Sequence, residues 1–160
     1  MSTAIQTLNK VVELAHKRRD EALAQMAQLQ REMAQAQEQM QQLQTYADEA
    51  QTRWSQRSSV GVDANVLNHH RQFMQKIDHA VDFQRGVLGQ RQAQVDQAQQ
   101  RVHVAERDLA GLRKYTDRKV QALLHSAQRQ EQKQTDEMAL SIHLRQRLAQ
   151  STITTKGARP

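Results

Sequence analysis

Histidines are the residues of this sequence best suited to metal or acid–base chemistry, because the chain contains no cysteine. His69, His70 and His79 lie close together in the sequence. Adjacent histidines point to different faces of a helix, however, which argues against a shared metal site. The sequence also lacks a glycine-rich phosphate loop, a GxSxG motif and an HExxH motif. We therefore expect no catalytic residue, no metal, no cofactor and no small-molecule substrate.

Basic side chains form dense clusters at Lys17–Arg19, Arg113–Lys114 and Arg118–Lys119. The net charge of +6 favours acidic partners, which include nucleic acid, acidic protein surfaces and anionic lipid. Elsewhere the Lys and Arg residues are mixed with Asp and Glu, and aromatic residues make up only 3% of the chain. Stacking on nucleic-acid bases is therefore not expected. The clusters fit either an acidic protein surface or a simple solvated face.

The composition favours long helices over a layered core. Only 38% of the residues are apolar, Gln and Ala are the commonest residues, and the single proline is Pro160. No apolar run approaches the roughly 20 residues that cross a bilayer, and the N-terminal residues 1–6 do not resemble a signal peptide. We expect a cytoplasmic, all-α protein.

A heptad pattern runs through the N-terminal part of the chain. Its apolar residues recur at alternating steps of three and four, and only Arg19 breaks the series. A period of 3.5 residues sustained in this way predicts the seam of a left-handed coiled coil. The positions are Ile5, Leu8, Val12, Ala15, Arg19, Ala22, Met26, Leu29, Met33, Ala36, Met40, Leu43, Ala47, Ala50 and Trp54.

Residues 58–63 interrupt this pattern with small, polar and glycine residues and predict a turn. Gly61 can adopt the left-handed conformation that ends a helix, and Asp63 can serve as the N-cap of the next helix. The chain is therefore expected to form a single antiparallel coiled-coil hairpin over residues 1–150. Its parts are a first helix at about 3–57, a second at about 64–150 and a flexible tail at 151–160.

A second heptad series follows the turn, slips by one position near Thr116 as a stutter would, and resumes at Val120. Its members are Leu67, His70, Met74, Ile77, Val81, Gln84, Leu88, Arg91, Val95, Ala98, Val102, Ala105, Leu109 and Leu112. Folding back near residue 60 leaves residues 120–150 without a first helix to pair with, an overhang of roughly 45 Å. Apolar residues continue there, at Leu123, Leu124, Ala127, Met138, Ile142, Leu144 and Leu148. This pattern predicts an interface for another protein.

Two aromatic residues flank the predicted seam near the turn. Tyr46 precedes the seam residue Ala47, and Phe73 precedes Met74. Such rings serve either as packing caps of the seam or as docking residues, and a pair on the two arms favours a binding patch.

The charged segment at residues 129–139, Arg-Gln-Glu-Gln-Lys-Gln-Thr-Asp-Glu-Met-Ala, resembles the C-terminal motif of the FliJ family of flagellar type III export proteins. The chain length, the turn position and the absence of cysteine agree with this resemblance. It implies a γ-subunit-like stalk that inserts its terminal end into the ring of the export ATPase FliI. The other contacts it implies are with the cytoplasmic domain of the export gate protein FlhA and with export chaperones, so that the protein would associate peripherally with the inner membrane.

The resemblance also assigns residues to these contacts by position. The gate-binding residues would be Gln39, Leu43, Tyr46, Ala50, Phe73, Ile77, Ala80 and Gln84, and Ala50 stands where relatives carry an aromatic residue. The ATPase-binding residues would be Arg129, Glu131, Lys133, Asp136 and Glu137. Two alternatives share the same helical pattern, namely a stalk or scaffold of a virulence type III secretion system and a basic coiled coil that binds nucleic acid.

Overall fold

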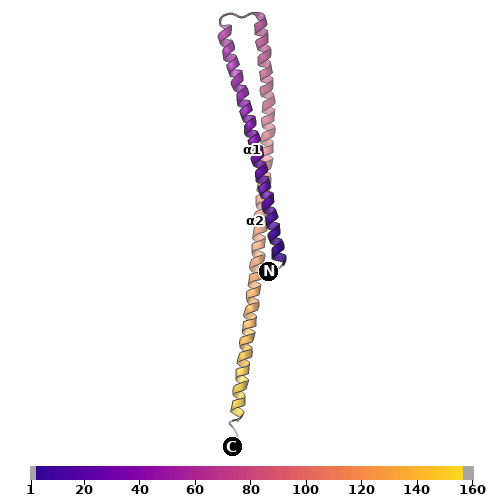
Figure 1. Ribbon diagram of the computed structural model, residues 1–160, viewed down its shortest axis with the longest axis vertical. Helices are drawn as coiled ribbons and strands as arrows, with labels where there is room; N and C mark the ends of the chain where they lie inside the picture. Colours follow the sequence, from indigo (N-terminus) through magenta and orange to yellow (C-terminus); the bar gives the residue numbers. More distant parts are fainter. Residues whose placement is uncertain (1–2, 157–160) are drawn as a thin grey trace. The chain divides into compact units, whose positions relative to one another are not determined.

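The computed structural model describes residues 3–156 and consists of two long helices joined by a short turn (Figure 1). Helix α1 spans Thr3–Ser58 and helix α2 spans Ala64–Lys156. The predicted all-α fold, with two long helices packed against each other, is confirmed.

Helix α2 continues beyond the predicted end at about residue 150, so the predicted flexible tail is helical as far as Lys156. Its hydroxyl side chains bond back to the preceding helical turn, which is compatible with continued helix. Thr152 Oγ1 donates to the Leu148 carbonyl at 2.9 Å, and Thr154 Oγ1 donates to the Gln150 carbonyl at 2.6 Å. The remainder of the predicted tail, residues 157–160, lies outside the described residues.

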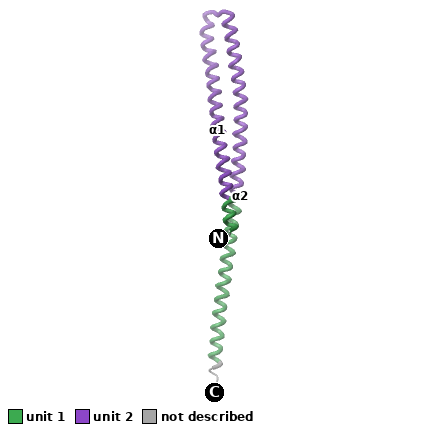
Figure 2. Tube along the Cα trace, turned by 45° about the vertical axis from the view of Figure 1, so that its right-hand side comes forward, with its two compact units in different colours: residues 1–11, 111–160 green, residues 12–110 purple. Residues whose placement is uncertain are grey.

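The chain divides into two compact units, which are described separately (Figure 2). Residues 12–110 form the hairpin unit, drawn in purple. The terminal unit, drawn in green, contains residues 3–11 of α1 and residues 111–156 of α2 among those described.

The turn of the hairpin unit has the geometry that its sequence predicts. Gly61 has φ +98°, in the left-handed region, and its N–H donates to the Ser58 carbonyl at 3.2 Å. Asp63 directly precedes α2, and its carbonyl accepts the Leu67 N–H at 3.1 Å. A residue that accepts the first helical hydrogen bond from just outside the helix occupies the N-cap position, so this prediction is confirmed.

The seam of the hairpin unit matches the predicted heptad positions closely. Every predicted position of α1 from Val12 to Trp54 is buried or half-buried, and so is every predicted position of α2 from His70 to Leu109. Leu67 is the exception, with 36% of its surface exposed beside the turn. The buried apolar residues are Ala15, Ala36, Met40, Ala50, Ile77, Ala98, Val102 and Leu109. Alanines are prominent among them, which allows the two backbones to approach closely.

Two arginines occupy seam positions without burying their charge. The Arg19 side chain is 29% exposed, and its guanidinium donates to the neighbouring Asp20 carboxylate at 3.0 Å. Arg91 Nη1 reaches across to Glu32 Oε2 of α1, also at 3.0 Å. The aliphatic stems of both residues therefore line the seam while their charged heads remain at its edge.

In the terminal unit the seam ends soon after the predicted slip. Ile5 and Leu8 of α1 and Val120 of α2 are half-buried, and Thr116 is 7% exposed. Every described side chain from residue 121 to residue 154 is exposed, so no other described part of the terminal unit covers this stretch of α2. Neither helix contains, within the described residues, an apolar stretch long enough to span a membrane.

Candidate protein-binding surfaces

An aromatic pair joins the two helices in the hairpin unit. The rings of Tyr46 on α1 and Phe73 on α2 meet edge to face, with centroids 5.8 Å apart and an interplanar angle of 75°. The residues nevertheless remain 47% and 37% exposed. The prediction that these rings flank the seam is confirmed, and they combine a packing contact with a surface open to a partner.

The predicted gate-binding residues differ in their exposure to solvent. Gln39, Tyr46 and Phe73 are exposed, and Leu43 and Ala80 are half-buried. The other three, Ala50, Ile77 and Gln84, are buried with exposures of 9%, 5% and 8%. Five of the eight are therefore accessible on the assembled hairpin, and the other three are part of its seam.

Gln84 connects the seam to this surface. Its Nε2 donates to the backbone carbonyl of Ala36 at 2.9 Å and lies 3.4 Å from Gln39 Oε1. A buried amide needs such partners, because leaving it unpaired away from water is costly. The contact links the exposed Gln39 side chain to the buried seam.

Open hollows lie on both sides of Tyr46. One is lined by Gln39, Gln42, Leu43, Tyr46 and Gln84. The other is lined by Glu38, Gln41, Gln42, Thr45, Tyr46 and Glu49. Heptad spacing identified the seam but not these hollows, because most of their lining residues lie outside the seam positions.

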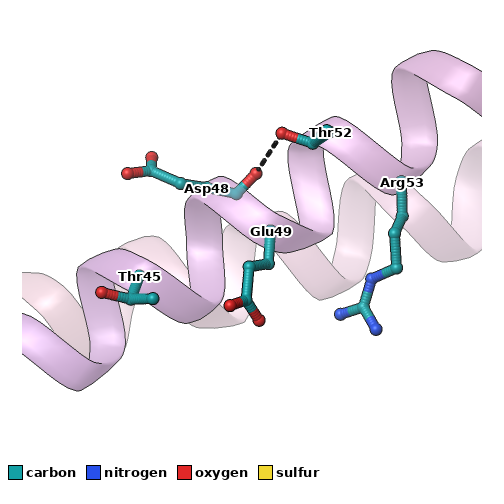
Figure 3. Close-up of a pocket in the computed structure, with 5 residues that line it drawn as sticks. All are labelled: Thr45, Asp48, Glu49, Thr52 and Arg53. Atoms are coloured by element: carbon teal, nitrogen blue, oxygen red, sulfur yellow. Dashed lines mark hydrogen bonds between the residues drawn. The ribbon is translucent and has the colours of Figure 1, made fainter.

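A third hollow continues along α1 and is shown in Figure 3. It is lined by Thr45, Asp48, Glu49, Thr52 and Arg53, all of them exposed. Thr52 Oγ1 donates to the Asp48 backbone carbonyl at 2.9 Å, so the hydroxyl faces its own helix and the carboxylates remain turned to solvent. Asp48 and Glu49 outnumber Arg53 among the lining residues, so this part of the α1 surface has a small net negative charge.

The three histidines singled out in the sequence differ in their contacts and exposure. His70 stacks on Trp54 of α1, with ring centroids 4.0 Å apart and an interplanar angle of 6°. Both are predicted seam positions, but the heptad pattern does not reveal their stacking. His69 and His79 are exposed. Within residues 3–156, no group of three or more His, Asp or Glu side chains is arranged to hold a metal ion.

The predicted basic clusters lie on exposed surface, apart from Arg19, which is a half-buried seam residue. Lys17 and Arg18 are exposed in the hairpin unit. In the terminal unit Arg118 and Lys119 are exposed, and Lys119 Nζ lies 5.7 Å from the centre of the Tyr115 ring.

The predicted ATPase-binding residues are all exposed on the uncovered part of α2 in the terminal unit. Gln132 Nε2 donates to the Asp136 carboxylate at 3.2 Å, and an open hollow is lined by Arg129, Gln132, Lys133, Asp136, Glu137 and Leu140. Residues 128–137 contain no apolar side chain, so this stretch is a polar band around the helix.

Apolar side chains resume after the polar band and occupy two faces of α2. Met138 and Ile142 are four residues apart, as are Leu140, Leu144 and Leu148 in succession. Residues two positions apart, such as Ile142 and Leu144, lie about 200° apart around a helix, on opposite faces. These five residues are 51–69% exposed. A helix with apolar residues on opposite faces is suited to being enclosed rather than lying in a one-sided groove.

The fold and these surfaces define a helical-hairpin protein with partly exposed aromatic and apolar side chains. The family model described as flagellar FliJ protein matches residues 4–148, and the chain belongs to this family. The family consists of non-enzymatic components of flagellar export. A search of curated proteins finds no match to the sequence.

Proposed function

We propose that the chain is a stalk of the flagellar type III export apparatus that links the export ATPase ring to the export gate. The observation that carries this proposal is the uncovered part of α2, where described side chains 121–154 are all exposed and apolar residues occupy opposite faces. An isolated helix of this kind is only marginally stable in water, and enclosure by a partner would stabilise it.

The export ATPase ring is the partner that we assign to this segment. A ring surrounds what it binds and can therefore cover both apolar faces, including Ile142 on one and Leu144 on the other. The polar band before them offers charges of both signs, such as Lys133 and Asp136, for pairing at the mouth of the ring.

The export gate is the partner that we assign to the surface around Tyr46 and Phe73. Two partly exposed rings in a fixed edge-to-face geometry form a rigid anchor, and ordering them on binding costs little conformational entropy. We extend the proposal to export chaperones and to peripheral association with the inner membrane, both of which the family membership suggests.

Coupling between the two partners would follow from differential affinity. A ring state that binds α2 more tightly would change the population of stalk conformations that the gate encounters. The protein would need no hydrolytic activity of its own to transmit this change.

The ATPase contact can be tested with the purified full-length chain and the export ATPase. Changing Leu144 and Leu148 to Gln, and in a second variant reversing the charges of Lys133, Asp136 and Glu137, should lower the affinity at least tenfold. Circular dichroism should show unchanged helicity, because all these side chains are exposed. Unchanged binding by both variants would contradict the ATPase assignment.

The gate contact is tested by replacing Tyr46 and Phe73 with Ala and measuring binding to the cytoplasmic domain of the gate protein. Weaker binding with intact helicity supports the assignment, whereas a melted hairpin would identify the rings as packing residues. The same titrations with duplex DNA address the nucleic-acid alternative. That alternative predicts affinity that falls steeply with salt and survives loss of the two rings.

A further inference from the structure

Phe83 is a third aromatic residue on the surface of the hairpin unit, and 75% of it is exposed. It is therefore more exposed than Tyr46 or Phe73, and it is absent from the gate-binding residues assigned by the family resemblance. Like those two rings, it directly precedes a predicted seam residue, in this case Gln84.

Helical spacing extends the aromatic surface from Phe73 to Phe83. Ala80 follows Phe73 by seven residues, Phe83 follows Ala80 by three, and Val87 follows Phe83 by four. Residues at these spacings share a face of a helix. Ala80 and Val87 are half-buried, so they form the apolar floor between the seam and the exposed Phe83 ring.

The neighbouring part of α1 has a distinctive charge. Four acidic residues and no Lys or Arg occur between Arg31 and Arg53, although the whole chain has a net charge of +6. Glu32 is paired with Arg91, whereas Glu38 and Glu49 are exposed and line the same hollow as Tyr46. On its α1 side the aromatic surface is thus bordered by carboxylates, whereas α2 carries Lys76 and the ion pair of Arg85 with Asp82.

We propose that Phe83 is an anchor of a docking surface, shared with Tyr46 and Phe73, that binds a basic segment of a partner protein. The rings pack against the aliphatic stems of its Lys and Arg residues and face their cationic heads, while Glu38 and Glu49 pair with those heads. The inference rests on the proposed function, because it takes the partner segment to belong to the cytoplasmic domain of the export gate.

The first test measures the affinity of the full-length chain for that gate domain after Phe83→Ala and, separately, Phe83→Gln. Both replacements are good helix formers at an exposed position, so circular dichroism should be unchanged. We expect at least a tenfold loss of affinity. Val104→Ala is the matched control, because Val104 lies 21 residues later at the same heptad position and is 51% exposed. Its affinity should remain within twofold of the native value.

The second test changes the charge of the border. The double variant Glu38→Lys, Glu49→Lys should bind the gate domain at least tenfold more weakly at 50 mM salt, with a smaller difference at 500 mM because salt screens the repulsion. The control Glu13→Lys, Glu21→Lys makes the same change in net charge at exposed positions elsewhere on α1. It should leave the affinity close to native.

The outcomes separate the inference from the proposed function. A native chain that does not bind the gate domain refutes the proposed function. A native chain that binds, and is weakened by Tyr46→Ala but by neither Phe83 variant, refutes the inference alone. If the Glu38→Lys, Glu49→Lys variant binds the gate domain with native affinity, the proposal that the partner segment is basic is refuted. Self-association of the native chain that both Phe83 variants abolish would instead assign this surface to a second copy of the protein.

Discussion

Gln84 allows the energetics of the seam to be tested with two contrasting substitutions. It is 8% exposed, and its Nε2 donates to the Ala36 carbonyl at 2.9 Å. That carbonyl lies inside α1, where the N–H of Met40 is its regular helical donor. Removing the Gln84 amide therefore deprives the carbonyl of a second donor without leaving it unpaired.

The magnitudes follow from this geometry. Gln84→Ala loses a buried hydrogen bond worth about 1 kcal/mol and a buried methylene worth about 0.8 kcal/mol. We expect the free energy of unfolding to fall by about 2 kcal/mol. Gln84→Leu loses the same hydrogen bond, but a buried Leu side chain contributes about 1.5–3 kcal/mol. We expect this variant to be as stable as the native protein or about 1 kcal/mol more stable.

Urea unfolding followed by circular dichroism at 222 nm measures both changes, provided that the slope of the transition is the same in all variants. Gln90 is exposed on the same helix, so Gln90→Ala and Gln90→Leu are the controls and should each change stability by less than about 0.5 kcal/mol. If Gln84→Leu destabilises the protein as much as Gln84→Ala, the reasoning is refuted, because the amide contact would then outweigh apolar burial.

Three further predictions concern the backbone, the ion pair and the uncovered helix. A Cβ added at Gly86 would meet nothing within 4 Å, so Gly86→Ala should stabilise α2 by about 0.5–1 kcal/mol and raise the thermal midpoint. Gly61→Ala should lower the thermal midpoint, because Gly61 has φ +98°, a conformation that strains a residue with a Cβ. A double-mutant cycle that replaces Arg91 and Glu32 with alanine should yield a coupling energy of about 0.5 kcal/mol. This energy should decrease in 1 M salt, because both side chains are about one-third exposed. A coupling energy that does not change with salt would contradict this interpretation. Deletion of all residues after 120 should leave the urea midpoint of the hairpin unchanged, because the described side chains beyond residue 120 are exposed. A large decrease in the midpoint would contradict this prediction, since it would require stabilising contacts that the burial pattern does not show.

Heptad spacing by itself determined the seam, because an apolar stripe with a period of 3.5 residues is buried most efficiently against a second helix of the same period. It predicted the buried or half-buried positions of α1. The small, polar and glycine residues at 58–63 predicted the turn with Gly61 in the left-handed conformation, and the unequal lengths of the two arms predicted the loss of burial after Val120. Heptad spacing also identified the flanking rings of Tyr46 and Phe73. The end of α2 was predicted too early, because the polar residues after Gln150 contain no strong helix breaker before Gly157.

Only the tertiary structure decided how individual side chains use the seam. Spacing could not show that Gln84 would bond the Ala36 carbonyl or that His70 would stack on Trp54, since each contact depends on the axial register of the two helices. Phe83 illustrates the same limit. It precedes a seam residue as Tyr46 and Phe73 do, but its seam neighbour occupies the other of the two core positions of the heptad. A residue that precedes this core position points farther from the partner helix, which is why the Phe83 ring is the most exposed of the three.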